Sequence, residues 1–153
     1  MGTTIVVLQI GDGYALTACV GDSRIYLLRE NTLKQVTQDH SLVSELVRYN
    51  IIDEKDKIFL QNKNIITRAL GMTENVSVDI TNQEILPGDL FLLCSDGLTD
   101  LVGNEKIEAI LNENYNNLDQ GLDKLIDEAN NLGGQDNITV SLVKIDESEA
   151  GDS

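Results

Sequence analysis

The chain has 153 residues, the size of about one domain, and 41% of them are hydrophobic, which is enough to form a core. Its 26 Asp and Glu residues against 11 Lys and Arg residues give a net charge of −15, which argues against nucleic acid or an anionic membrane surface as the main partner, because both attract clustered basic residues. No apolar run is long enough to span a bilayer, no signal peptide is visible, and Cys19 and Cys94 lie in apolar runs, so we expect buried, reduced thiols in a cytoplasmic protein.

Residues 3–37 are predicted to form an antiparallel meander, because β-branched and apolar segments alternate with turns that contain Gly, Asp or Asn. The expected strands are Thr3–Ile10, Tyr14–Val20, Arg24–Arg29 and Leu33–Thr37. The expected turns are Gly11–Gly13, Gly21–Ser23 and Glu30–Thr32.

The next stretch is expected to be helical at first and then irregular. Apolar residues at helical spacing predict a helix over Ser41–Tyr49, with Ser41 as its N-cap. Residues 53–57 are charged without periodicity, and the weak signal from there to Asn64 predicts a mobile loop. Ile65–Leu70 is expected to be a short strand that Gly71 closes.

The third stretch returns to strands. The alternation of Val76, Val78 and Ile80 with polar residues predicts a half-buried strand. Leu86–Asp89 has Pro and Gly in the positions that favour a type II turn. The continuous apolar run Leu90–Cys94 then predicts a strand that is covered on both faces.

The last part is predicted to contain two amphipathic helices, Asn104–Glu113 and Leu118–Leu132, the second ending at Gly133–Gly134. Ile138–Ile145 is expected to be a final strand, and the small, acidic tail 146–153 is expected to be disordered. This order of elements predicts an α+β domain with mainly antiparallel sheet.

Four aspartates lie at or near the predicted strand ends: Asp22, Asp96, Asp100 and Asp136. Taken singly, each has an ordinary explanation, because Asp is common in turns and Asp100 is suited to cap a short helix. Taken together, strand ends can share one edge of a sheet packing, and the spacing of Asp96 and Asp100 puts both on one face of a helical turn. Carboxylates that converge ionise together only with a cation, and oxygen ligands alone select Mg²⁺, Mn²⁺ or Ca²⁺. The single histidine, His40, is expected to be a hydrogen-bonded structural residue rather than a ligand or base.

The chain resembles the metal-dependent serine/threonine protein phosphatases of the PP2C class, bacterial branch. The matching segments are Met1–Thr4, Gly21–Arg24, Thr37–Ser41, Ile66–Gly71, Leu86–Asp89, Cys94–Asp100 and Gly134–Thr139. Each alone is a weak signal, whereas the ordered set is specific and covers nearly the whole chain. The resemblance implies an antiparallel β-sandwich flanked by helices, present here as an incomplete phosphatase domain over residues 1–145.

The resemblance also implies roles for individual residues. Asp96 and Asp136 match ligands of the same ion in a catalytic pair of Mn²⁺ or Mg²⁺ ions, and Asp22 and Asp100 match ligands of a third, weaker metal site that shares Asp96. Residues from about 39 to 63 match the flap that the family associates with substrate selection and turnover. The implied reaction is hydrolysis of phosphoserine or phosphothreonine in protein substrates by a water that two divalent ions activate. A serine/threonine kinase is a common partner of bacterial relatives.

The family's N-terminal segment has no counterpart in these residues, which begin at the Met1–Thr4 motif. In the family that segment carries further acidic ligands, a phosphate-binding arginine and a histidine that acts as a general acid. We therefore expect a partial active site, weak or no activity of the isolated chain, and self-association through exposed apolar surface or an open sheet edge. Two alternatives are a catalytically inactive truncated or pseudo-phosphatase that acts as a binding module, and an acidic cation-binding or structural domain.

Overall fold

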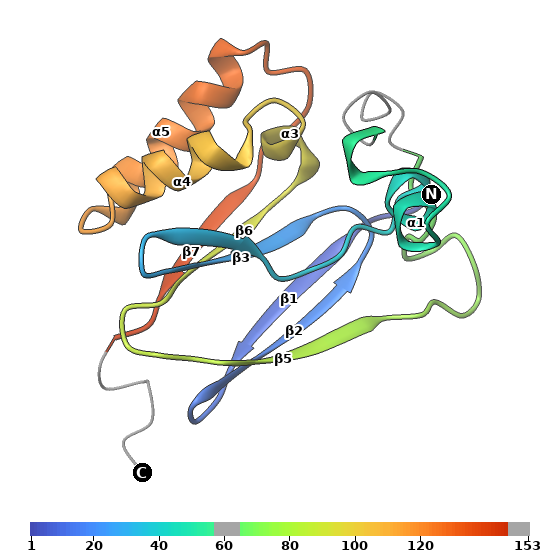
Figure 1. Cartoon of the computed structure of the whole chain (residues 1–153), viewed down its shortest axis with the longest axis horizontal. Coiled ribbons are helices and arrows are strands. Elements are labelled where there is room, and N and C mark those ends of the chain that lie inside the picture. The colour runs from blue at the N-terminus through green and yellow to red at the C-terminus, as the bar shows by residue number, and fades with distance from the viewer. Residues whose placement is uncertain (57–64, 147–153) are drawn as a thin grey trace.

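A computed structural model describes residues 1–56 and 65–146 and contains two antiparallel sheets (Figure 1). The three-stranded sheet has the order β1 (Ile5–Ile10), β2 (Tyr14–Val20), β5 (Asp79–Glu84). The four-stranded sheet has the order β4 (Thr32–Gln35), β3 (Arg24–Arg29), β6 (Leu90–Cys94), β7 (Val140–Lys144). Every strand pair is antiparallel, which confirms the predicted α+β sandwich.

Three predicted strands, β2, β3 and β6, have the bounds that the sequence pattern indicated. The predicted fourth strand is shifted, since β4 ends at Gln35 rather than Thr37. The ladder stops there because the N–H groups of Val36 and Thr37 both donate to the carbonyl of Ile25, at 2.8 and 3.4 Å. The hydroxyl of Thr37 in turn accepts the Ile25 N–H at 3.0 Å.

A hydrophobic core fills the space between the two sheets. Ile25 and Leu27 of β3 and Phe91 of β6 face the three-stranded sheet, where they pack with Ala15 of β2. These side chains are between 0% and 5% exposed. Because side chains alternate along a strand, the other buried residues of β3 and β6 face the opposite way, into a second core: Tyr26, Leu28, Leu90, Leu92 and Cys94.

The second core lies between the four-stranded sheet and three helices, α3 (Asp96–Thr99), α4 (Asn104–Glu113) and α5 (Leu118–Asn131) (Figure 1). Tyr26 of β3 and Leu92 of β6 pack there with apolar side chains of the helices. The strand β6 is therefore covered on both faces, as predicted. In the described parts of the chain, none of the helices is long and apolar enough to cross a bilayer.

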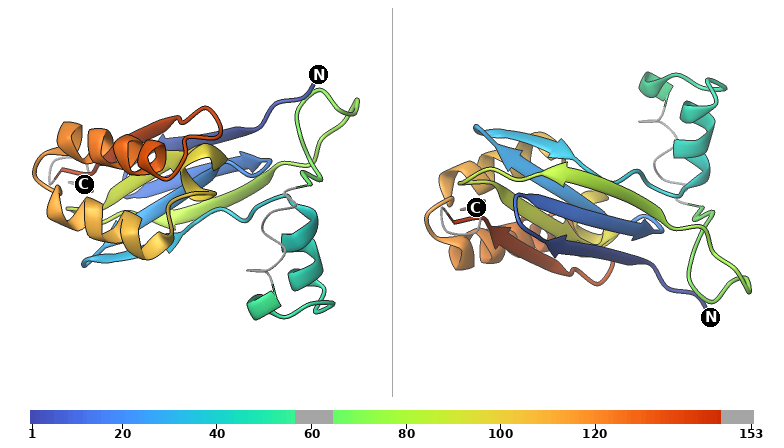
Figure 2. Two further views of the ribbon diagram at one scale, coloured as in Figure 1. Left: turned by 90° about the horizontal axis from the view of Figure 1, so that it is seen from above. Right: turned by 90° about the horizontal axis from the view of Figure 1, so that it is seen from below.

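The outer face of the three-stranded sheet is apolar and open, and Figure 2 shows no described helix over it. Val7, Ala18 and Ile80 are cross-strand partners on this face, and Val7 and Ile80 are 42% and 63% exposed. The prediction of a half-buried strand at 76–80 is therefore wrong in two respects. The strand β5 begins only at Asp79. Its apolar residue, Ile80, lies on the outer face and is exposed because no described element covers this side.

Between β4 and β5 the chain leaves the sandwich, and α1 (Leu42–Arg48) projects from one end of it (Figure 2). The hydroxyl of Ser41 accepts the N–H of Ser44 at 3.3 Å, which confirms the predicted N-cap. The predicted strand over 65–70 is wrong: Ile66 and Leu70 each form one isolated bridge, to Ser41 and Thr3, so no continuous ladder forms. The loop expected up to Asn64 and most of the expected disordered tail lie outside the described residues.

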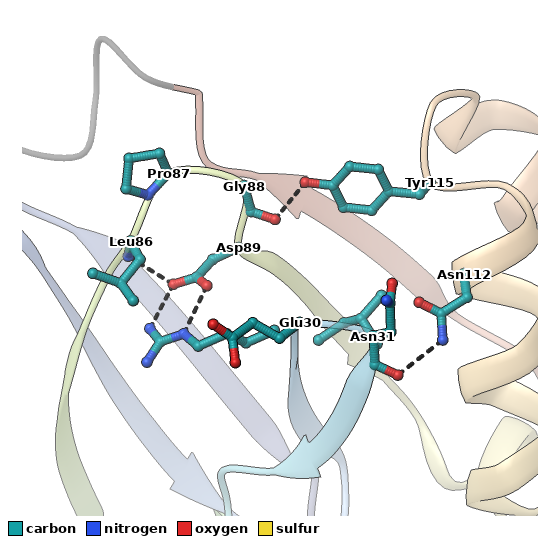
Figure 3. A pocket seen from close by; sticks show the side chains of 10 residues that line it. Glu30, Asn31, Leu86, Pro87, Gly88, Asp89, Asn112 and Tyr115 are labelled. Atoms are coloured by element: carbon teal, nitrogen blue, oxygen red, sulfur yellow. Dashed lines mark hydrogen bonds and ion pairs between the residues drawn. The ribbon is translucent and has the colours of Figure 1, made fainter.

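The turn before β6 is fixed by a buried ion pair (Figure 3). Gly88 has φ +88°, as the predicted type II turn requires. The carboxylate of Asp89 accepts hydrogen bonds from Arg29 Nε (2.9 Å), Arg29 Nη2 (2.7 Å) and the Leu86 N–H (2.8 Å). The Asp89 side chain is only 2% exposed, so its charge depends on these donors.

We predict that Asp89→Ala lowers the free energy of unfolding by about 3 kcal/mol, because it leaves the partly exposed Arg29 guanidinium and the Leu86 N–H without their buried acceptor. Glu128→Ala is the control, since Glu128 faces Lys106 at 4.0 Å on the surface and its loss should change stability by less than about 1 kcal/mol. Urea denaturation followed by circular dichroism measures both. Equal effects of the two substitutions would contradict the assignment of the Asp89 ion pair as a structural anchor.

Candidate functional site

The turn between β2 and β3 presents Asp22. Gly21 has φ +109°, a backbone conformation that residues other than glycine rarely adopt. A Cβ at this position would overlap the side chain of Thr4. The next residue, Asp22, is 5% exposed. The turn therefore holds a carboxylate in a largely buried position at the end of the sandwich.

Asp96 and Asp100 belong to the short helix α3, which follows directly on the buried strand β6. Asp96 is the first residue of this helix, and Asp100 is its C-cap, with its N–H donated to the Asp96 carbonyl at 2.9 Å. Asp100 therefore does cap a short helix, at the C-terminal end of α3. The predicted helical turn between the two aspartates is confirmed.

The loop that carries Asp136 is held against the start of α3. The N–H of Ser95 donates to the Thr139 carbonyl at 3.0 Å, and the hydroxyl of Ser95 accepts the Thr139 N–H at 3.0 Å. A Cβ at Gly97 would overlap the carbonyl oxygen of Asn137, so only glycine allows this close approach. These contacts bring Asp96 and Asp136 together, although they lie about 40 positions apart in the chain.

The aspartates influence one another's ionisation. Burial, followed by the charges of Asp96 and Asp39, raises the pKa of Asp22 to about 6, and the charge of Asp100 contributes in the same direction. Burial, followed by the charge of Asp136, also raises the pKa of Asp96. Burial and neighbouring negative charges both make ionisation of these carboxylates unfavourable, and a bound cation would offset both effects.

These carboxylates do not form a closed cage. In residues 1–56 and 65–146, no three His, Cys, Asp or Glu side chains converge closely enough to hold an ion. The donor set fits a hard divalent ion, because the four side chains offer only carboxylate oxygens. The assignment of the four aspartates as metal ligands stays a prediction.

An ion pair that the sequence pattern did not single out lies beside the aspartates. Arg24 donates from Nε and Nη2 to both carboxylate oxygens of Asp39, the shortest contact being 2.6 Å. Arg24 Nη1 also donates to the hydroxyl of Tyr26 at 3.0 Å, and that hydroxyl donates to Asn104 Oδ1 at 3.0 Å. This network ties Asp39, which precedes the segment that contains α1, to β3 and to α4. The positive charge of Arg24 partly offsets the rise in the pKa of Asp96.

The remaining reactive side chains have the predicted structural roles. Cys19 and Cys94 are buried free thiols, and burial raises their pKa to about 11 and about 12. Both thiols therefore stay protonated at neutral pH and are poor nucleophiles. His40 is 3% exposed and hydrogen bonded through both ring nitrogens, which confirms the expectation for the single histidine.

A pocket of about 280 Å³ lies at the other end of β3, beside Arg29, the Asp89 turn and Tyr115 (Figure 3). Several of its polar side chains are already hydrogen bonded within the fold: Tyr115 donates its hydroxyl to the Gly88 carbonyl and Asn112 donates to the Asn31 carbonyl. These groups are already engaged in holding the fold. The acidic end is therefore the stronger candidate for chemistry.

Comparison with known proteins agrees with the resemblance. The sequence model described as Protein phosphatase 2C matches residues 1–138. The serine/threonine phosphatase stp of Listeria welshimeri is 46% identical over 144 residues, which are 94% of this chain and 57% of that protein. Protein phosphatase PhpP of Streptococcus pneumoniae is 40% identical over 150 residues, or 98% of this chain and 61% of that protein.

Solved structures give the same result. The Mycobacterium tuberculosis serine/threonine phosphatase PstP/Ppp superposes with a TM-score of 0.89 at 34% identity, over 96% of this chain and 61% of that one. The catalytic domain of PstP in complex with two manganese ions superposes with a TM-score of 0.84 at 34% identity, over 96% and 60%. The 153 residues thus span about three fifths of the length of these relatives.

We predict that Gly97→Ala weakens Mn²⁺ binding and lowers the free energy of unfolding by about 1–3 kcal/mol, because the new methyl group pushes the Asn137 carbonyl, and with it Asp136, away from Asp96. Gly103→Ala is the matched control, since a Cβ there meets no atom within 4 Å. Isothermal titration with Mn²⁺ and urea denaturation measure the two effects. A Gly97→Ala protein with the affinity of the Gly103→Ala protein would show that the close approach is irrelevant to the ion.

The pKa of Asp22 predicts a pH dependence. Because folding raises this pKa from 3.8 to about 6, the protonated side chain favours the folded state below about pH 4, and this contribution is lost as the pH rises through 6. In EDTA at about pH 7.5, Asp22→Asn should therefore raise the free energy of unfolding by about 2 kcal/mol, and the gain should vanish at about pH 4. Added Mn²⁺ should stabilise the wild-type chain more than the variant. A gain that is independent of pH would contradict this assignment.

Proposed function

Because this chain belongs to the protein phosphatase 2C family, we propose that it supplies part of the active site of an enzyme that hydrolyses phosphoserine and phosphothreonine in proteins with the help of divalent metal ions. The observation that carries the proposal is the electrostatic coupling of aspartates from separate turns at one end of the sandwich. The family match supports the same reading of these residues.

The residues of this chain act mainly by binding and orienting. Asp96, at the start of α3, and Asp136, on the loop joined to it through Gly97 and Ser95, would hold one ion. Asp22 and Asp100 would hold a further ion together with Asp96. A bound pair of Mn²⁺ or Mg²⁺ ions lowers the pKa of a water molecule and offsets the charge of the phosphate.

Two features of the chain prepare these carboxylates for their role. The burial of Asp22 keeps bulk water from competing for its oxygens. The ion pair of Arg24 with Asp39 places a fixed positive charge beside Asp96 and holds the start of the flap against β3. Because the two cysteines are buried and protonated, this part of the chain supports attack by a water molecule rather than by a thiolate.

The site in these residues is incomplete. The chain spans about three fifths of its relatives, and the general acid and phosphate-binding arginine of the family have no matching positions in it. We assign residues 1–145 to the partial phosphatase domain, with a flap over about 39–63, and residues 146–153 to an acidic tail. In the family that the chain resembles, further ligands lie in a segment before the motif that Met1–Thr4 matches.

The proposed reaction defines the partners and the setting. The substrate is a phosphorylated protein, and a serine/threonine kinase that installs the phosphate acts in the same pathway. Reduced, buried cysteines and a strongly acidic surface fit a cytoplasmic protein. The open outer face of the three-stranded sheet favours self-association when nothing else covers it.

We predict that the chain alone, with Mn²⁺, hydrolyses p-nitrophenyl phosphate at least about 100-fold more slowly than a complete relative, because these residues supply only one side of the proposed metal pair. Adding the N-terminal segment of such a relative in trans should restore Mn²⁺-dependent turnover, and Asp96→Asn should abolish the restored activity. Full activity of the chain alone would contradict the partial site. A complex that forms in trans but stays inactive would favour the binding module instead.

We predict that Ile80→Lys reduces self-association at high concentration while leaving the melting temperature nearly unchanged, because Ile80 is 63% exposed on the open sheet. Ile85→Lys is the contrast, since Ile85 is 2% exposed in the core between the sheets and should unfold the protein. Sedimentation velocity over a concentration series measures the association. An Ile80→Lys chain that associates as strongly as the wild type would exclude this face as the contact.

A further inference from the structure

One residue, His40, forms two hydrogen bonds with the backbone of the turn that presents Asp22. The N–H of Gly21 donates to Nδ1 of His40 at 3.0 Å, and the N–H of His40 donates to the carbonyl of Gly21 at 2.8 Å. Both polar groups of the Gly21 backbone are thus engaged by the same residue. Gly21 is the residue with φ +109° that directs the chain into Asp22.

These bonds determine the tautomer of the imidazole. Because a backbone N–H can only donate, Nδ1 of His40 must accept and carries no proton. The proton of the neutral ring therefore lies on Nε2, which donates to Oδ2 of Asp79 at 2.7 Å. Asp79 at the start of β5 is held in turn by Arg68 Nη1 at 2.9 Å. The hydrogen bond from His40 and the contact with Arg68 lower the pKa of Asp79, so it stays an acceptor at neutral pH.

His40 also joins the two ends of the excursion that contains α1. Its carbonyl accepts the N–H of Thr67 at 2.9 Å, and the next residue, Ser41, forms a bridge with Ile66. Thr67 donates its hydroxyl to Glu45 of α1 at 2.8 Å. The two described ends of the excursion are therefore fastened to each other at His40, which is itself bonded to the Gly21 turn.

We propose that His40 is a positioning residue for Asp22: its unprotonated Nδ1 and its backbone N–H lock Gly21, and Asp79 with Arg68 locks the ring. The consequence for metal binding rests on the proposed function, whereas the locking of the turn does not. A group that fixes a ligand through a hydrogen bond, without touching the ion, typically changes metal affinity when it is removed. The proposal gives the beginning of the flap a direct mechanical connection to one edge of the aspartate site.

Two isosteric substitutions separate positioning from general stability. The amide of Asn reaches the place of Nδ1, so His40→Asn keeps an acceptor for the Gly21 N–H and loses the bond to Asp79. The amide of Gln reaches the place of Nε2, so His40→Gln keeps the bond to Asp79 and loses the acceptor. Each variant loses one ring hydrogen bond, and both should lower the melting temperature to a similar extent. Ile107→Val, in the core under α4, is the control for a modest loss of stability away from the turn.

The first measurement is the Mn²⁺ affinity of the whole chain. Only the Mn²⁺ binding that Asp22→Asn abolishes is compared between the variants. His40→Gln should weaken it by about 10-fold or more, whereas His40→Asn and Ile107→Val should stay within about 2-fold of the wild type. Equal losses in His40→Asn and His40→Gln, or no loss in either, would overturn the proposal.

The second measurement does not depend on a metal. Amide hydrogen exchange of Gly21, followed by NMR without Mn²⁺, should be at least about 10-fold faster in His40→Gln than in His40→Asn, because only the first lacks the acceptor. If the wild-type chain binds no Mn²⁺, the proposed metal site fails and this exchange difference decides the positioning role alone. Equal exchange in the two variants refutes the locking of the turn.

Discussion

Repulsion between carboxylates that the backbone forces together is the constraint on which the acidic end of this protein depends. Burial and neighbouring negative charges raise the pKa of both Asp22 and Asp96, so the folded chain keeps these groups where ionisation is unfavourable. The sandwich can keep them there because each turn is anchored by uncharged contacts. Ser95 binds Thr139, Gly97 admits the Asn137 carbonyl, and His40 holds Gly21. Under the proposed function, a divalent ion would convert this repulsion into attraction and would link folding to metal binding.

The fold separates stability from this site. The two cores and the Asp89 ion pair hold the sheets and the helices α4 and α5 in place, and the pocket beside Asp89 is at the end of β3 away from Asp22. The site end carries the excursion with α1 and the charged network of Arg24. The open outer face of the three-stranded sheet agrees with a chain that spans about three fifths of its structural relatives.

Local pattern was sufficient where an element packs against a neighbouring layer. The bounds of β3, β6 and α4 were predictable because their apolar periodicity matches the cores that they enter. The same periodicity was misleading for β5, since alternation at Val78 and Ile80 reports an apolar face but not whether anything covers it. The apolar run at 65–70 forms single bridges rather than a ladder because its partners, Ser41 and Thr3, come from different parts of the chain.

The candidate site was predictable only in part. The sequence indicates Asp22, Asp96 and Asp136 because each lies near a strand end beside or close to glycine. In the structure, the charge of Asp96 acts on Asp22 and the charge of Asp136 acts on Asp96. The ion pair of Arg24 with Asp39 and the bond of His40 to Asp79 join residues 15 and 39 positions apart. No spacing rule for a helix or strand connects such positions, so only the tertiary fold reveals them.

The most direct test of the account is a crystal structure of the chain soaked in Mn²⁺, with anomalous diffraction used to locate the ion. The account predicts an anomalous peak at about 2.1 Å from carboxylate oxygens of both Asp96 and Asp136, the distance at which oxygen ligands hold a small divalent ion. Peaks only on unrelated surface carboxylates, with Asp96 and Asp136 turned away from each other, would contradict it.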